Sequence, residues 1–371
     1  MTRRQTPITV GRVSTARLAT VGPVLTARLV WILAIACLGW LTPAELVYTQ
    51  GTQSRAPQDG RSASWAWKPA IPTGNDGGVH VLPVRGNVYM LVGAGGNITV
   101  HAGTDGILMV DAGLASMSGK VLEAVRSISK GPLRYIVNTN EREEHSGGNA
   151  TIAAAGSTIP FRPAEDVRVS DARLGKDRAN VIAFLTVFHR MSAPTGQVAA
   201  RPEEAWPDNT YSTPQKKLYF NDEPVLIMHV PSNTDGNSIV HFRTADVISV
   251  GDLVDLTAYP VIDLKAGGSI QAVIDGLYRV IDLTVPNRKS EAGTLVIPGH
   301  GRLADQPDVV YYQQMVAIVK DRIKDMIARG MTLAQVKAAK PTRDYDPRYS
   351  RETGPWTTDM FVEAAYESLK K

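Results

Sequence analysis

Residues 136–149 combine side chains that could bind a metal ion or a charged substrate. An apolar run ends here in a polar loop that holds the adjacent pair Glu144 and His145, and two glycines then close the loop. A loop that follows a strand is held by a rigid element, and glycine lets the backbone approach a ligand closely. The same loop also carries Arg142, which is always charged and only donates hydrogen bonds, so it opposes a bound cation.

Two more apolar runs end in an ionisable residue. Asp252 follows Val250-Gly251, and His300 lies in Pro298-Gly299-His300-Gly301. In each case a predicted strand carries one potential ligand into the loop that follows it. Loops of this form can converge to build a binding site whose side chains are held by rigid elements.

These segments together resemble the metallo-β-lactamase superfamily over about residues 86–305. In that family the loop after a strand reads Thr-His-x-His-x-Asp-His-x-Gly-Gly-Asn, and Thr139–Asn149 occupies the same frame. Asp252 resembles the family's bridging aspartate and His300 its last histidine. Asp111, in Val110-Asp111-Ala112-Gly113, resembles the Asp-x-Gly strand end that supports the metal ligands from behind.

The resemblance implies an α/β fold, a four-layer αββα sandwich, with one or two zinc ions at the strand ends. The sequence departs from the family in one half of that site, where three histidine positions hold Asn140, Arg142 and Asn233. The other half keeps its ligand types, with glutamate in place of aspartate. The expected metal ligands are therefore Glu144, His145, Asp252 and His300, and they predict a reduced site for a single zinc ion.

Three functions remain open on this interpretation. The first is a metal-dependent hydrolase of unknown substrate. The second is a metal-free protein that binds a small anionic ligand through Arg142, and the third is a degenerate fold kept for interaction or stability. The carboxylate and amide oxygens could instead admit Mg²⁺ or Ca²⁺, but His145 and His300 favour zinc.

Composition limits the partners and the compartment. The chain has 371 residues and a formal charge of +4, and the basic excess comes from five arginines in residues 1–44, a segment without acids. The remaining chain has 40 − 5 = 35 basic and 36 acidic residues, so we expect no nucleic-acid partner. Residues 1–44 read as an export signal for the periplasm or for secretion, and alternatively residues 29–41 anchor the chain to a membrane.

The only cysteine, Cys37, lies within this signal. The mature chain is therefore expected to contain neither a disulfide nor a thiolate metal site. A small-molecule substrate or anion is the expected partner, and the sequence leaves the oligomeric state open.

The resemblance implies a metallo-β-lactamase-like domain at 86–305. A linker and N-terminal extension (45–85) precedes it, and hydrophobic periodicity predicts a C-terminal helical extension (306–371) after it. Thr332 and Gln335 predict a capping box. The predicted strands are 88–92, 97–101, 107–110, 133–138, 217–220, 224–230, 238–242, 247–250 and 294–297. The predicted helices are 118–128, 178–191, one after Ser269, one ending at Gly330, and 358–369, with a Pro-rich loop at 193–214.

Overall fold

The computed structural model describes residues 76–158, 177–194, 199–285 and 293–370. They belong to the larger of two units into which the chain divides, Gly60–Lys371. The predicted export signal (1–44) and most of the predicted linker (45–85) lie outside the described residues. Among the described helices, none combines the length and apolar composition that a membrane span requires.

The first sheet has seven strands in the order β1-β2-β3-β4-β5-β6-β7. Strands β1 to β4 pair antiparallel through short turns, whereas β4 to β7 pair parallel. Helix α1 (Ser118–Ile128) connects β4 to β5, because parallel neighbours need a crossover. The strands are His80–Arg85 (β1), Val88–Val92 (β2), Ile98–Gly103 (β3), Gly106–Val110 (β4), Leu133–Val137 (β5), Asn180–Phe184 (β6) and Asn209–Tyr211 (β7).

The second sheet has five strands in the order β12-β11-β10-β9-β8. β11 and β12 pair parallel, and the other neighbours pair antiparallel. The strands are Gln215–Phe220 (β8), Glu223–His229 (β9), Ser238–Phe242 (β10), Val247–Asp255 (β11) and Leu295–His300 (β12). The predicted strands of both sheets are confirmed, with shifts of a few residues at their ends.

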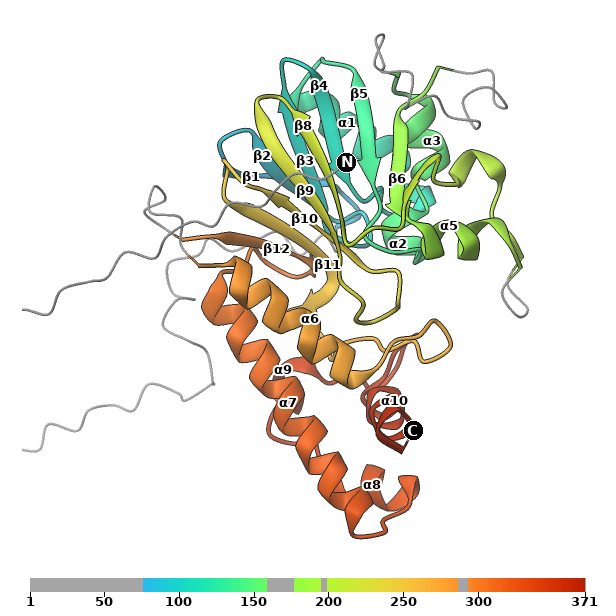
Figure 1. Ribbon diagram of the computed structural model, residues 1–371, viewed down its shortest axis with the longest axis vertical. Coiled ribbons are helices and arrows are strands. Elements are labelled where there is room, and N and C mark those ends of the chain that lie inside the picture. The colour runs from blue at the N-terminus through green and yellow to red at the C-terminus, as the bar shows by residue number, and fades with distance from the viewer. Residues whose placement is uncertain (1–75, 159–176, 195–198, 286–292, 371) are drawn as a thin grey trace, which may run out of the picture. The chain divides into compact units, whose positions relative to one another are not determined.

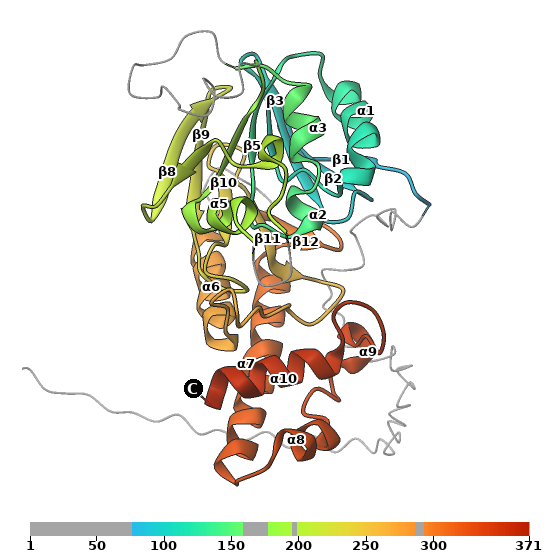
Figure 2. The same cartoon turned by 90° about the vertical axis from the view of Figure 1, so that its right-hand side faces the viewer.

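The two sheets pack face to face, with helices on both outer sides (Figures 1 and 2). Val137 of the first sheet shares a buried apolar cluster with Val240 and Ile297 of the second. Helices α1 and α3 (Asn149–Ala154) cover the outer face of the first sheet. Helices α6 (Ile270–Leu283) and α7 (Gln306–Ala328) cover the outer face of the second. This arrangement confirms the four-layer αββα sandwich.

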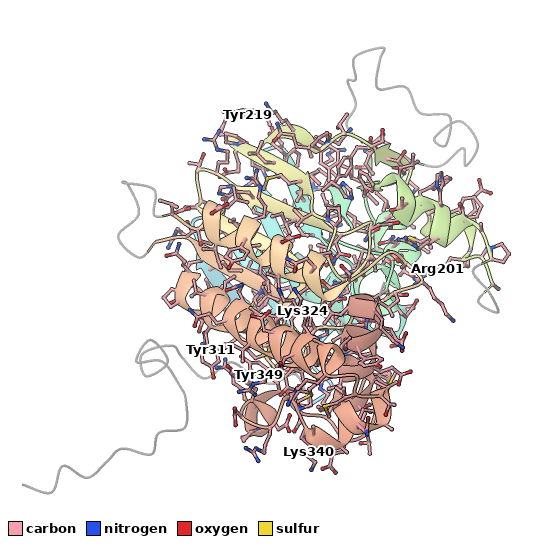
Figure 3. All side chains as sticks on the ribbon, turned by 60° about the horizontal axis from the view of Figure 1, so that its bottom comes forward. Arg201, Tyr219, Tyr311, Lys324, Lys340 and Tyr349 are labelled. Carbon is pink, nitrogen blue, oxygen red and sulfur yellow. The ribbon has the colours of Figure 1, made fainter. Side chains whose placement is uncertain are left out.

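The C-terminal region is helical, as predicted. It contains α7, α8 (Leu333–Ala339), α9 (Asp346–Tyr349) and α10 (Thr358–Lys370). Figure 3 labels Lys340, which follows α8, and Tyr349, which ends α9. The predicted capping box of Thr332 and Gln335 starts α8. Helix α10 packs against α6, α7 and α8, so the region extends the outer helical layer of the second sheet.

The helix predicted at 178–191 is wrong in its first half and confirmed in its second. Residues 178–191 form strand β6 followed by helix α5 (Leu185–Ser192). A short continuous apolar run fits a buried strand as well as a buried helix, so periodicity does not separate the two. β6 is a strand because it pairs with β5 on one side and with β7 on the other. The loop predicted at 193–214 likewise contains the short strand β7.

A buried histidine away from the strand-end loops should make stability depend on pH. His101 of β3 is 0% exposed and contacts the rings of Phe220 and Phe242. Among the described residues neither ring nitrogen has a hydrogen-bond partner. Burial lowers its pKa from 6.5 to about 4. As the pH falls below 6.5, His101 binds a proton in the unfolded chain but stays neutral in the folded chain. The free energy of unfolding therefore decreases until the pH reaches the folded pKa.

We expect wild type to lose about 2 kcal/mol more unfolding free energy than His101→Phe when the pH is lowered from about 8 to about 5. The difference between the two chains isolates His101, because the other titrating groups are shared. Urea denaturation at both pH values measures it. Parallel pH profiles for the two chains would contradict the expectation.

Candidate metal centre

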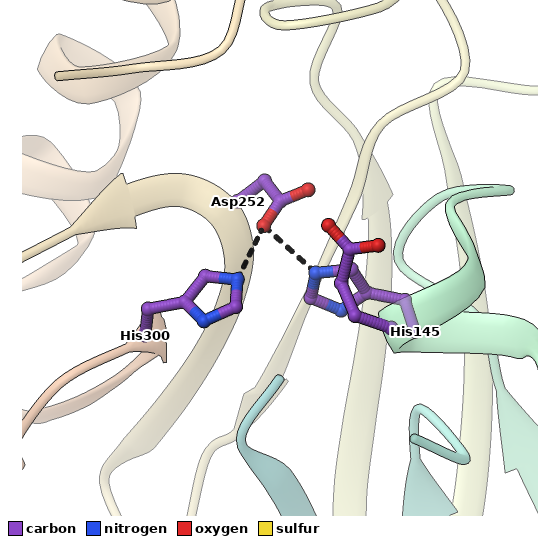
Figure 4. Close-up of side chains that lie close together, drawn as sticks. His145, Asp252 and His300 are labelled. Atoms are coloured by element: carbon purple, nitrogen blue, oxygen red, sulfur yellow. Dashed lines mark hydrogen bonds and ion pairs between the residues drawn. The ribbon is translucent and has the colours of Figure 1, made fainter. Parts of the chain in front are cut away.

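Helix α2 and two strands, β11 and β12, bring the predicted ligands together. Glu144 and His145 lie in the short helix α2 (Glu143–Ser146), which follows the loop after β5. Asp252 belongs to β11, and His300 ends β12. Each of the four residues offers a ligand atom, and these atoms all lie within 4.8 Å of one another. Figure 4 shows Asp252 between His145 and His300.

Asp252 lies within a strand, whereas the sequence analysis placed it in a loop after residue 250. β11 continues to Asp255, but its register against β12 is interrupted on both sides of Gly251. Gly251 has φ +51°, and a Cβ there would lie 2.5 Å from Oγ1 of Thr139. Only glycine fits both restrictions. The irregularity therefore redirects Asp252 toward the cluster without ending the strand.

His145 is held between two carboxylates. Its side chain is 0% exposed, its Nδ1 lies 2.7 Å from Oδ2 of Asp111, and its Nε2 lies 2.7 Å from Oδ1 of Asp252. Burial by itself would lower the pKa of His145, but Asp252 and Asp111 outweigh it and hold the pKa well above its ordinary value. The ring is thus fixed in orientation, with Nε2 directed at the cluster.

Asp111 is itself fixed from behind. The backbone N–H and the hydroxyl of Thr139 each donate a 2.7 Å hydrogen bond to its carboxylate. Asp111 has φ +67°, a left-handed conformation that is strained for a residue with a side chain. This geometry suits the supporting role predicted for Asp111.

The two oxygens of Asp252 face different halves of the site. Oδ1 lies 2.7 Å from Nε2 of His145 and 3.5 Å from Nε2 of His300. Oδ2 lies 3.2 Å from Nδ2 of Asn140 and 3.2 Å from Nε of Arg142. The histidines and their positive charge hold the pKa of Asp252 well below its usual range despite burial, which acts in the opposite direction.

Arg142 also pairs with Glu144. Its Nε and Nη2 lie 2.7 and 2.5 Å from Oε1 of that residue. Burial works to raise the pKa of Glu144, but the guanidinium outweighs it and holds the pKa below its ordinary value. Arg142 thus joins Asp252 and Glu144 on the side where the family places its first metal. The neighbouring Glu141 pairs with Arg190.

Asn233 is not joined to the cluster. Its side-chain amide donates to the carbonyl of Val261 at 2.7 Å and its Oδ1 lies 3.5 Å from Nδ2 of Asn237. It does line the same cavity as Arg142. Of the three departures from the family pattern, two contact Asp252 and the third stabilises a neighbouring loop.

Sequence reasoning missed two residues that shape the surroundings of the cluster. Thr139 anchors Asp111, and Arg190 of α5 bridges Glu141 and Asp235. Thr139 is the first residue of the family motif, and this position is the signal that pointed to it. Arg190 gave no local signal, because its two partners lie 49 and 45 residues away in the chain.

The side chains present fit one metal ion. Two imidazoles and two carboxylates suit zinc, and a histidine whose Nδ1 is held by a carboxylate keeps Nε2 for an ion. Glu144 and His300 are 21% and 26% exposed, which leaves the cluster open to solvent on that side. In the other half, the amide of Asn140 and the guanidinium of Arg142 point N–H donors at Asp252, and these cannot ligate a cation.

Residues 91–300 match the family model described as the Metallo-beta-lactamase superfamily. Among solved structures, a double mutant of the sec-alkyl sulfatase PisA1 has a TM-score of 0.54 and 14% identity. The sec-alkylsulfatase Pisa1 from Pseudomonas sp. has a TM-score of 0.52 and 13% identity. In both cases the match covers 78% of this chain and 50% of the sulfatase chain, so this protein spans about half their length.

A metallo-beta-lactamase from Pontibacter korlensis matches with a TM-score of 0.47 and 15% identity, over 64% of this chain and 99% of that one. No curated protein sequence matches the chain significantly. At these identities the two sulfatase matches establish the fold alone. The family match covers more than half of the chain.

Proposed function

This chain belongs to the metallo-beta-lactamase superfamily, and on that premise we propose that it is a hydrolase with a reduced site for one zinc ion. One observation carries the proposal. Glu144, His145, Asp252 and His300 each place a ligand atom within 4.8 Å of the others, and this donor set suits zinc. We propose that its substrate is a small molecule with a bond that hydrolysis cleaves.

Each residue has a distinct part in this proposal. Glu144, His145, Asp252 and His300 would hold the ion. A zinc ion in such a site polarises a carbonyl, phosphoryl or related group and supplies hydroxide near neutral pH. Asp111 orients His145 and increases the basicity of its Nε2. Arg142, which is 32% exposed beside the carboxylates, can hold an anionic group of the substrate or stabilise charge that develops on oxygen.

The second candidate is a metal-free protein that binds a small anion through Arg142. The observation in its favour is that Arg142 already contacts both Glu144 and Asp252, so two carboxylates have a cationic partner without any metal. In that case the pocket would take an anion that competes with these carboxylates for the guanidinium. A chelator would leave such binding unchanged.

Metal analysis of the purified protein tests the hydrolase. We expect about one zinc ion per chain after zinc supplementation, and hydrolysis of at least one compound among β-lactams, esters, thioesters, phosphoesters and alkyl sulfates. His300→Ala should lose both the ion and the hydrolysis. His189→Ala is the matched control, because His189 is an exposed histidine of α5 outside the cluster.

The outcomes separate the two candidates. A wild-type chain that retains no metal after supplementation would refute the hydrolase. A thermal shift caused by sulfate or phosphate in the presence of chelator, in that same chain, would support the anion-binding protein. Metal content that is equal in wild type and His300→Ala would place the ion outside the cluster.

A further inference from the structure

A cavity of about 440 Å³ opens beside the cluster. Arg142 and Asn233 line it, and both occupy positions where the family has a metal-binding histidine. Arg142 connects this cavity to the cluster, because the same guanidinium contacts Glu144 and Asp252. Its volume lies in the range of about 300–1,000 Å³ that is usual for small-molecule pockets.

One wall of the cavity comes from the C-terminal region. Trp356, Met360 and Ala364 line it, the last two from helix α10. In Figure 1, α10 lies next to the loop that joins β11 to α6, and Val261 and Leu264 of that loop add to the apolar lining. Because α10 packs on α6, α7 and α8, this wall is fixed by the core beneath it.

Two polar atoms of the lining are buried without a partner among the described residues. They are Oε2 of Glu141 and Nε1 of Trp356. An unpaired buried polar atom is destabilising, so such atoms are rare in folded proteins. Both side chains line the cavity, so part of its polar lining is left without a partner by the described residues themselves.

The part of the cavity lining that lies beyond Glu141 and Arg142 has more acidic than basic side chains. Beyond Glu141 and Arg142, the lining carries Asp263, Glu363 and Glu367 against the single cation Lys265. These carboxylates would repel a second anionic group of a ligand. The apolar side chains instead favour a hydrocarbon portion, because they lose contact with water when it binds.

We propose that this cavity holds the uncharged apolar tail of a substrate whose hydrolysable group lies at the Glu144, His145, Asp252 and His300 cluster. Helix α10 then selects substrates by the length and the charge of that tail. The inference rests on the proposed hydrolase for the reacting group, but the tail site itself requires no metal.

Binding of simple carboxylates to the full chain tests the tail site. The carboxylate stands in for the anionic reacting group, and the probes are butyrate, octanoate and octanedioate. Isothermal titration is carried out once with chelator and once with zinc. We expect octanoate to bind at least about tenfold more tightly than butyrate in both conditions, since it buries additional methylene groups. Octanedioate, with a second charge at its far end, should lose this advantage.

A charged variant of the wall provides the specific test. Met360 is 41% exposed on α10 and lines the cavity, so Met360→Asp should fold and place a carboxylate beside the tail. It should reduce the preference for octanoate over butyrate to less than about threefold. The matched control is Ile318→Asp, because Ile318 is 40% exposed on α7 and does not line the cavity. The control should keep the full preference.

Equal affinity for octanoate and butyrate, no detectable binding of octanoate, or an unchanged preference in Met360→Asp would each overturn the inference. The proposed hydrolase can fail separately. A chain that prefers octanoate but binds no zinc and hydrolyses nothing retains the tail site and loses the hydrolase. A zinc hydrolase that ignores tail length retains the hydrolase and loses the tail site.

Discussion

Replacing Asp252 with asparagine is expected to lower the unfolding free energy of the metal-free protein by about 3–5 kcal/mol. The carboxylate is buried, with 6% of its side chain exposed, and faces His145 and Arg142 at 2.7 and 3.2 Å. The amide removes the negative charge and leaves two cationic groups in contact with a neutral side chain. Urea denaturation near neutral pH, in the presence of chelator, measures the loss.

Asp275→Asn is the control for this experiment. Asp275 is an exposed residue of α6 that accepts one hydrogen bond from Gln271, so its loss should be within about 0.5 kcal/mol. Combining Asp252→Asn with Arg142→Gln should cost less than the sum of the two single changes, because the second change removes an unpaired charge. A loss below about 1 kcal/mol for Asp252→Asn would mean that the cluster does not depend on this carboxylate.

Replacing Arg142 with glutamine is expected to raise the affinity for zinc by about tenfold to a hundredfold. A guanidinium a few ångströms from a divalent ion repels it in a partly buried site. Its removal also frees Oε1 of Glu144, which the guanidinium contacts at 2.5 Å. Competition against a chromophoric chelator measures the dissociation constants of both chains.

Arg201→Gln is the matched control for Arg142. Arg201, labelled in Figure 3, pairs with Glu143 at 2.8 Å and donates a hydrogen bond to the carbonyl of Glu141. Neither partner is a proposed ligand. Its zinc affinity should equal that of wild type. The same variants test the anion-binding candidate, in which Arg142→Gln abolishes a sulfate-induced thermal shift in chelator. Unchanged zinc affinity in Arg142→Gln would contradict the view that the guanidinium opposes the metal.

The sequence was most informative where chemistry depends on neighbours in the chain. The frame Thr139–Asn149 is contiguous, so the replacement of two histidine positions by Asn140 and Arg142 could be read directly. Helices such as α6 and α10 show their apolar faces at a spacing that a linear sequence preserves. By contrast, the run at β6 was read as a helix, because its strand character depends on pairing with β5 and β7.

The sequence by itself determined the ligand types and the asymmetry of the loop that holds Glu144, His145 and Arg142. It determined these because residue identity and short-range spacing fix which side chains can donate or accept. Only the tertiary structure decided that Asp252 places one oxygen against His145 and the other against Asn140 and Arg142, at sequence separations above 100 residues. The tertiary structure likewise decided that residues of α10 line the same cavity as Arg142. Contacts between such distant segments arise from the packing of two sheets and their helices, which leaves no local pattern in the chain.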